Sequence, residues 1–178
     1  MGIAVVLNLD NKLLKKVYNA QEILLNELEI KHQIINQSHP HINIFSGDIK
    51  DSFLDEFINT IKDFNKTNNK IKYKINSNGL GVFVFDNPVI YVRYKNSHIF
   101  DKLRSFLFKK NIYWKNLDKT IKRDLWLPKT TIAHKDTNIK NLSSALKYIQ
   151  HLNFVDSIEF KKLSLIEYSV NTPEKSLL

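Results

Sequence analysis

Pro40-His41-Ile42-Asn43-Ile44-Phe45 is the stretch on which the interpretation of this sequence depends. In an extended strand successive side chains point to opposite faces, so His41 and Asn43 share one face while Ile42 and Ile44 share the other. A titratable imidazole and a hydrogen-bonding amide therefore stand next to each other, away from the apolar residues. The stretch predicts a half-buried strand that presents two polar groups to a ligand.

A similar pattern returns far along the chain as Pro128-Lys129-Thr130-Thr131-Ile132-Ala133. Lys129 stands where His41 stands in the first stretch, and Thr131 stands where Asn43 stands. Two such strands that face one cleft would form a phosphate site without a metal ion. His134 lies five residues beyond Lys129. Because this spacing is odd, we expect His134 to face the other side of an undistorted strand.

Strand and helix patterns alternate around these two segments. Helix caps are predicted at Asp10, at Ser52 with Asp55, and at Ser97, and apolar spacing predicts a fourth helix over 142–152. Besides the two motif strands, strands are predicted over 2–9, 71–75, 81–85, 89–94 and 158–166. We expect the first motif strand to close at Ser46-Gly47-Asp48. Residues 109–126 are loosely patterned, and the tail 171–178 is either a loop or a short edge strand.

This order of elements predicts an α+β fold with two pseudo-symmetric lobes, in which central antiparallel sheets line a cleft and helices lie outside. Residues 1–178 contain no linker rich in glycine, serine or proline, so we expect a single two-lobed domain. The 43% hydrophobic and 25% charged content is ordinary for a globular protein.

The composition also restricts the function. The chain has no cysteine, which excludes disulfides, thiolate nucleophiles and cysteine-ligated zinc. It shows neither a bilayer-spanning apolar run nor a signal-type N-terminus, so we expect a cytoplasmic protein that does not bind membranes. The net charge of +9 permits an anionic ligand such as RNA or a nucleotide, although the scattered lysines also suit a solvated surface. No P-loop, dinucleotide fingerprint or zinc-binding histidine spacing is present.

Over essentially its whole length the chain resembles the 2H phosphoesterase superfamily, which comprises 2′-5′ RNA ligase-like and cyclic-nucleotide phosphodiesterase proteins. The resemblance rests on the two motif segments, on Gly79-Leu80-Gly81-Val82-Phe83 before a strand, and on the initial apolar strand and helix. In that family two His-x-Thr/Ser motifs lie on equivalent strands of two lobes. The histidines act as acid and base, and the hydroxyls hold the phosphate.

Carried over by position, the resemblance implies that His41 and Lys129 are catalytic and that Asn43 and Thr131 bind phosphate. Asn43 departs mildly from the motif, because an amide N–H donates to phosphate as a hydroxyl does. Lys129 occupies a histidine position and departs more seriously. An ammonium with a pKa of about 10.4 cannot readily accept a proton at neutral pH, but it can stabilise phosphate charge and donate a proton.

The resemblance therefore implies a metal-independent phosphodiesterase, without a cofactor, that acts on a nucleotide or RNA end and is expected to be a monomer. Its substrates would be 2′,3′-cyclic phosphates or 2′-5′ linkages. An inactive scaffold that binds a nucleotide or RNA remains an alternative, as does a plain α+β domain in which both motifs are coincidental. We expect His32, His98 and His151 to be structural or exposed, and His39 to lie in a loop or behind the site.

Overall fold

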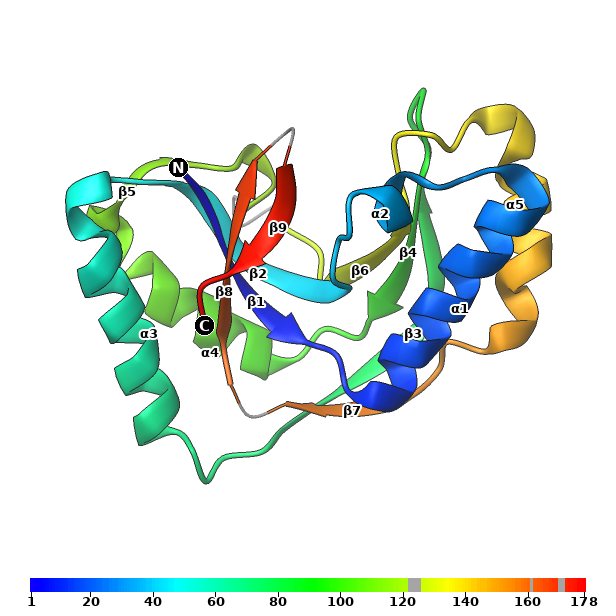
Figure 1. Cartoon of the computed structure of the whole chain (residues 1–178). Helices are drawn as coiled ribbons and strands as arrows, with labels where there is room; N and C mark the ends of the chain where they lie inside the picture. The colour runs from blue at the N-terminus through cyan, green and yellow to red at the C-terminus, as the bar shows by residue number, and fades with distance from the viewer. Residues whose placement is uncertain (122–125, 161, 170–171) are drawn as a thin grey trace.

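Two antiparallel sheets form the body of the molecule in the computed structural model, which describes residues 1–121, 126–160, 162–169 and 172–178 (Figure 1). The first sheet has the order β5-β2-β1-β8-β9 and the second has the order β6-β4-β3-β7. The strands are β1 Gly2–Asn8, β2 His41–Ile49, β3 Tyr73–Phe83, β4 Val89–Tyr94, β5 Trp114–Leu117, β6 Lys129–Ala133, β7 Ser157–Phe160, β8 Ser164–Ser169 and β9 Thr172–Ser176. The predicted α+β fold with antiparallel sheets is confirmed.

Four long helices cover the outer sides of the sheets, namely α1 Asn11–Leu28, α3 Leu54–Thr67, α4 His98–Phe108 and α5 Ile139–Ile149. The short helix α2 His32–Ile35 lies between the sheets and contacts β6 (Figure 1). Figure 1 shows α3 and α4 beside the first sheet, and α1 and α5 side by side on the second. Aromatic contacts fix α3, since Phe57 packs on Trp114 of β5 and Phe64 packs on Phe106 of α4. Most buried apolar residues of both sheets and these four long helices form one connected cluster, and Ala4, Val6 and Ile166 of the first sheet form a second, small one.

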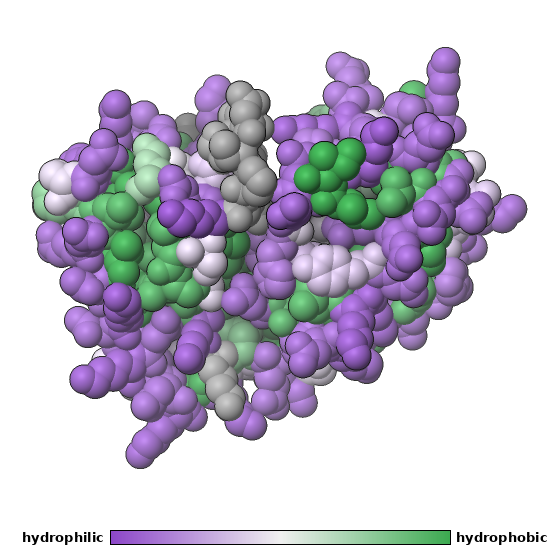
Figure 2. Space-filling model, in the orientation of Figure 1, coloured by the Kyte–Doolittle hydropathy of each residue, from purple (hydrophilic) through white to green (hydrophobic). Residues whose placement is uncertain are grey.

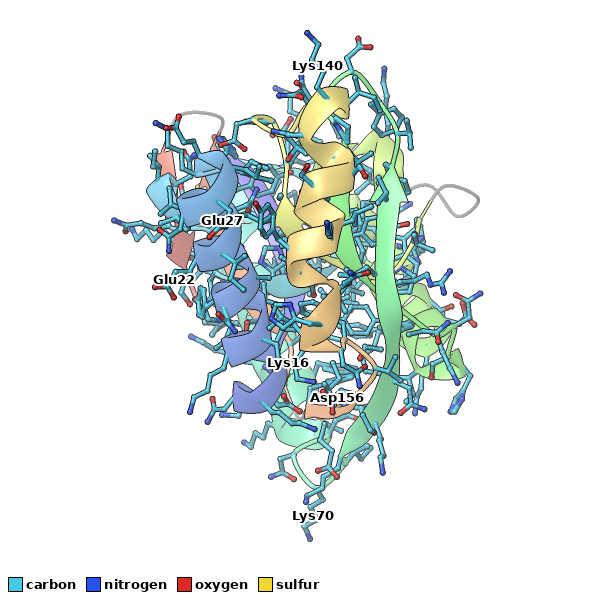
Figure 3. All side chains as sticks on the ribbon, turned by 90° about the vertical axis from the view of Figure 1, so that its right-hand side faces the viewer. Lys16, Glu22, Glu27, Lys70, Lys140 and Asp156 are labelled. Atoms are coloured by element: carbon cyan, nitrogen blue, oxygen red, sulfur yellow. The ribbon has the colours of Figure 1, made fainter. Side chains whose placement is uncertain are left out.

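Charged residues join the first helix to the start of β7. Lys12 and Lys16 both pair with the Asp156 carboxylate, with Lys16 at 2.6 Å. Figure 3 shows Lys16 on α1 next to Asp156, whereas Glu22 and Glu27 point away from the body of the molecule. The Lys12 hydrogen bond is the largest of the influences that lower the pKa of Asp156. These ion pairs hold α1 against the far end of the second sheet.

Polar side chains dominate the face of the molecule in Figure 2, and apolar side chains show between them over both sheets.

Two of the predicted helix caps are confirmed, and one is wrong. The side chain of Asp10 accepts a hydrogen bond from the Leu13 N–H, and Ser97 accepts one from the Ile99 N–H. Ser52 does not cap α3. Instead residues 51–53 form a short 3-10 turn closed by backbone hydrogen bonds, and α3 begins after it.

The predicted strands 71–75 and 81–85 are one strand, β3. Its first half pairs with β7 and its second half pairs with β4, with an irregularity between Ser77 and Leu80. Gly79 lies there at φ 79°, a conformation that glycine adopts without a steric penalty. The strand therefore bends and changes partner where the sequence suggested a break.

The first motif strand is longer than predicted, because Gly47 lies inside it. A Cβ on Gly47 would stand 2.2 Å from the Asn116 carbonyl oxygen of β5. The glycine therefore permits close pairing with β5, which the sequence analysis missed within residues 109–126. Residues 122–125 of that stretch lie outside the described residues.

The C-terminal part differs from the prediction in one respect. The strand predicted over 158–166 is two strands, with β7 in the second sheet and β8 in the first. The tail adopts the edge-strand alternative as β9, which pairs with β8; residue 171 lies outside the described part. Among the described residues, no helix is both long and apolar enough to span a membrane.

Candidate functional site

The two motif strands meet between the sheets. Ile42 and Ile44 are fully buried, whereas His41 and Asn43 are partly exposed on the opposite face of β2. β6 repeats this alternation, with Thr130 and Ile132 buried and with Lys129 and Thr131 partly exposed. The alternation predicted for both segments is confirmed.

Hydrogen bonds from the second motif segment hold the backbone of the first. The buried Thr130 hydroxyl donates to the His41 carbonyl oxygen at 2.9 Å, and the Trp126 indole N–H donates to the Asn43 carbonyl oxygen at 3.1 Å. Because the Thr130 proton is used in this way, the Tyr94 hydroxyl at 2.8 Å donates to the Thr130 oxygen. Burial raises the pKa of Tyr94 and keeps it a donor. The two strands are therefore held in fixed register.

One pocket of about 470 Å³ contains all four residues predicted for the site, His41, Asn43, Lys129 and Thr131. Its size is that of a small-ligand site. Further charged or titratable residues line it, namely His32, His39, His134, Lys135, Asp118 and Tyr168. With one aspartate against two lysines and four histidines, the pocket favours an anion.

A hydrogen bond to the backbone carbonyl of His39 fixes the tautomer of His41. Its Nδ1 lies 2.7 Å from the His39 carbonyl oxygen, which can only accept, so Nδ1 carries the proton and Nε2 carries the lone pair of the neutral ring. Burial lowers the pKa of His41 to about 4, and the Lys129 charge contributes in the same direction. His41 is therefore a neutral base at physiological pH, and it lies close enough to Lys129 for the ammonium charge to lower its pKa.

We expect the His41 ring to remain neutral at pH 5.5, where an unperturbed histidine with a pKa of about 6.5 is mostly protonated. Between about pH 6.5 and the folded-state pKa of about 4, the unfolded state binds a proton that the folded state does not. Through His41, the free energy of unfolding therefore decreases progressively as the pH falls through this range. A ¹⁵N NMR titration of the imidazole measures the midpoint directly, and a midpoint near 6.5 would contradict the position of the ring in the pocket beside Lys129.

Lys129 lines the same pocket. Burial lowers its pKa, which makes it a stronger proton donor than a solvated lysine. Its Nζ stands 6.0 Å from the centre of the Phe83 ring. Within the described part of the chain no carboxylate forms an ion pair with it. Its charge is thus available to an anionic ligand.

A hydrogen-bonded chain orients Asn43. Ser46 and Tyr168 both donate to the Asp118 carboxylate, Tyr168 at 2.8 Å. The Ser46 oxygen therefore accepts from the Asn43 Nδ2 at 3.0 Å. Only the second N–H of this amide remains for a phosphate. Asn43 can therefore donate one hydrogen bond to the ligand rather than two. The buried Oδ1 has no partner among the described residues.

Two histidines differ from their expected places, and a third lies where it was predicted. His134 lines the pocket, so the prediction that it faces away is wrong. The reason is that β6 ends at Ala133 and the chain turns through Lys135 at φ 71°, which breaks the alternation. His32 also lines the pocket instead of serving the structure alone. His39 lies in the loop before β2 and its carbonyl oxygen holds His41 from behind, as predicted, while its ring bonds the Tyr18 hydroxyl and lines the pocket.

Asp136 joins the α2 segment to the end of β6. One oxygen of its carboxylate accepts hydrogen bonds from the Lys31 and His32 N–H groups, at 2.7 and 2.6 Å. This contact brings His32 and His134 near each other, and the pKa of His134 is lowered first by burial and then by Lys135 and His32. Across the described residues no group of three or more His, Asp or Glu side chains is arranged to hold a metal ion.

The sequence offered no signal for Asp118 and Tyr168. Asp118 follows the strand β5 that the sequence analysis missed, and Tyr168 lies in β8, where strand alternation alone gives it no distinct role. Their place in the site follows from the order of strands in the first sheet.

A family model described as the 2′-5′ RNA ligase superfamily matches residues 19–172. The chain belongs to this superfamily. The match includes both motif segments and confirms the resemblance to 2H phosphoesterases. The replacement of the second histidine by Lys129 stays a prediction. Among curated proteins, none matches the sequence.

Two solved structures are similar to this chain. The crystal structure of TT0787 of Thermus thermophilus is similar with a TM-score of 0.59 and 14% identity, over 100% of this chain and 96% of that one. Usb1 of Kluyveromyces marxianus has a TM-score of 0.49 and 13% identity, over 99% of this chain and 96% of that chain. At this identity the TT0787 likeness supports the fold alone.

Proposed function

We propose that the protein is a metal-independent phosphodiesterase that acts on a nucleotide or RNA phosphodiester, with His41 as base and Lys129 as its cationic partner. The observation that carries the proposal is that both side chains line one pocket and interact electrostatically across it. Membership of the 2′-5′ RNA ligase superfamily supports a phosphodiesterase. The substrates we propose are 2′,3′-cyclic phosphates or 2′-5′ linkages at a nucleotide or RNA end.

His41 would begin the reaction. Because Nδ1 donates to the His39 carbonyl, Nε2 of the neutral ring accepts the proton of the attacking water or ribose hydroxyl. The oxygen then bonds to phosphorus, and the bond from phosphorus to the leaving ribose oxygen breaks. The low pKa of His41 keeps the base form populated near neutrality, although it also makes the ring a weak base.

Lys129 would complete the reaction. Its ammonium stabilises the negative charge that develops on the phosphate oxygens, and it donates a proton to the leaving oxygen. Burial lowers its pKa and favours this donation. The Thr131 hydroxyl and the remaining Asn43 N–H are the groups proposed to hold the non-reacting phosphate oxygens.

A binding protein on the same scaffold is the alternative function. The observations that favour it are the lysine at the second motif position and the engagement of Asn43 with Ser46. A lysine exchanges protons poorly at neutral pH, so a bound phosphodiester would persist without being cleaved.

Incubation without metal separates the two functions. A 2′,3′-cyclic nucleotide, a 3′,5′-cyclic nucleotide and a 2′-5′ dinucleotide are each assayed for product and for binding. Turnover of the first or third supports the phosphodiesterase. Tight binding of these compounds without any product supports the binding protein and removes the phosphodiesterase.

Lys129→His is expected to increase turnover by about tenfold or more, because an imidazole that titrates near neutrality is a better acid than an ammonium. The increase is measured as kcat on whichever phosphodiester the wild type cleaves. The matched control is Lys140→His, because Lys140 lies on α5 (Figure 3) and does not line the pocket. An unchanged or lower rate in Lys129→His would contradict the assignment of Lys129 to the second motif position.

A further inference from the structure

Three aromatic side chains lie near Lys129, outside the set of residues that line the pocket. The rings of Phe83 and Tyr91 lie 4.6 Å apart at an interplanar angle of 32°, and the rings of Phe83 and Phe85 lie 6.0 Å apart at 34°. We call Phe83, Phe85 and Tyr91 the aromatic platform. The Lys129 ammonium stands 6.0 Å from the centre of its middle ring. The platform therefore begins where the proposed phosphate site ends.

Strand register places the platform on the same face of the sheet as the site. Tyr91 of β4 is paired with Thr131 of β6 on one side and with Gly81 of β3 on the other. Cross-strand partners share a face, and Phe83 shares it with Gly81 because the two lie two residues apart. Thr131 lines the pocket, so Tyr91 and Phe83 extend the same surface towards the β3–β4 turn.

A glycine shapes the platform. A Cβ on Gly81 would lie 2.5 Å from ring atoms of Tyr91. Without it, the Tyr91 ring lies across the β3 backbone, and Phe83 packs against that ring. Tyr91 is consequently only 5% exposed and acts as the base on which the other rings rest.

The outer part of the platform is uncovered. Phe85 is 65% exposed, although a large aromatic side chain usually gains from burial. Arg93 is paired with Lys129 in the same register, is exposed, and interacts electrostatically with Tyr91. Aromatic rings with cations beside them are the arrangement that single-stranded nucleic acid recognises, because bases stack on rings while phosphates meet cations.

We propose that the aromatic platform is a base-stacking subsite, on which a base next to the phosphate held by Lys129 packs against Phe83 and Phe85. This inference rests on the proposed function, which places the phosphate at Lys129. It narrows the substrate class to the end of an unpaired RNA strand, because a base in a duplex is stacked on its neighbours and cannot lie on the platform. Arg93 would contact the adjoining phosphate.

Fluorescence anisotropy with two RNA probes tests the platform. One probe is a 5′-fluorescein-labelled trinucleotide that ends in a 3′-phosphate, and the other is the same trinucleotide without bases at its last two positions. Phe85→Ala is expected to raise the Kd of the base-bearing probe by about tenfold, as loss of one stacking ring does, and to leave the Kd of the abasic probe within about twofold. The difference between probes isolates stacking from any general effect on folding.

Tyr148→Ala is the matched control, since Tyr148 is an exposed aromatic residue on α5, outside the platform. It should leave both Kd values unchanged. The platform is overturned if Phe85→Ala weakens both probes equally or weakens neither. Turnover is assayed separately with a 2′,3′-cyclic nucleotide. If Phe85→Ala weakens binding of the base-bearing probe alone and no phosphodiester is turned over, the phosphodiesterase proposal is wrong and the stacking subsite stands. If the wild type turns over substrate but Phe85→Ala does not weaken binding of the base-bearing probe, the stacking subsite alone is wrong.

Discussion

His41→Ala is expected to lower kcat by about 10³-fold, within the range that loss of a general base produces. The imidazole is the neutral group whose Nε2 lone pair is fixed by the Nδ1 bond to the His39 carbonyl, and alanine offers no acceptor in its place. Because Thr130 and Trp126 bind the backbone of β2 rather than the His41 side chain, the strand itself should stay in position. The measurement is single-substrate kinetics without metal.

His98→Ala is the control for this prediction. His98 is exposed at the first residue of α4 and does not line the pocket. Its replacement should leave kcat unchanged. A His41→Ala variant that retains native circular dichroism and keeps kcat within about threefold of the wild type would exclude His41 as the base, since a general base contributes at least about 10²-fold.

Gly47→Ala is expected to lower the free energy of unfolding by roughly 3 kcal/mol, a large effect for a single methyl group. The added Cβ would stand 2.2 Å from the Asn116 carbonyl oxygen and 2.9 Å from the Leu117 Cα. Both are backbone atoms of β5, so no side-chain rotation relieves the clash and β5 must move away from β2. Urea denaturation followed by circular dichroism measures the change.

Gly79→Ala distinguishes steric from conformational cost. Gly79 has open space around its missing Cβ but lies at φ 79°, so alanine there should cost only about 1 kcal/mol. Equal losses in the two variants would contradict the close β2–β5 approach.

Displacement of β5 in Gly47→Ala would also move Asp118, whose N–H donates to the Ser46 carbonyl. Because Ser46 accepts from the Asn43 side chain, the variant should disturb the position of Asn43 in the pocket as well.

Alternation along short segments made part of this site predictable. His41 with Asn43, and Lys129 with Thr131, lie on one face of their strands because the residues between them are apolar or buried. The same local reasoning identified the caps at Asp10 and Ser97, where the side chain and the N–H it binds lie within three residues. Local patterns suffice where local bonds decide the structure.

Other features depend on contacts that are distant in the sequence. The long strand β3 bends at Gly79 and exchanges one partner for another, which no local pattern indicates. Asp118 reaches the pocket only because β5 pairs with β2, and His134 faces the pocket only because β6 ends one residue before it. Strand alternation cannot be extended past an end that the sequence does not mark.

The bond from Thr130 to the His41 carbonyl has a mechanical consequence. Hinging the two sheets apart to admit a ligand would break this hydrogen bond and leave the buried Thr130 hydroxyl without its acceptor, at a cost of about 1–3 kcal/mol. The gap between base and ammonium is consequently preset rather than assembled upon contact. A ligand is therefore expected to bind between the two side chains without separation of β2 from β6.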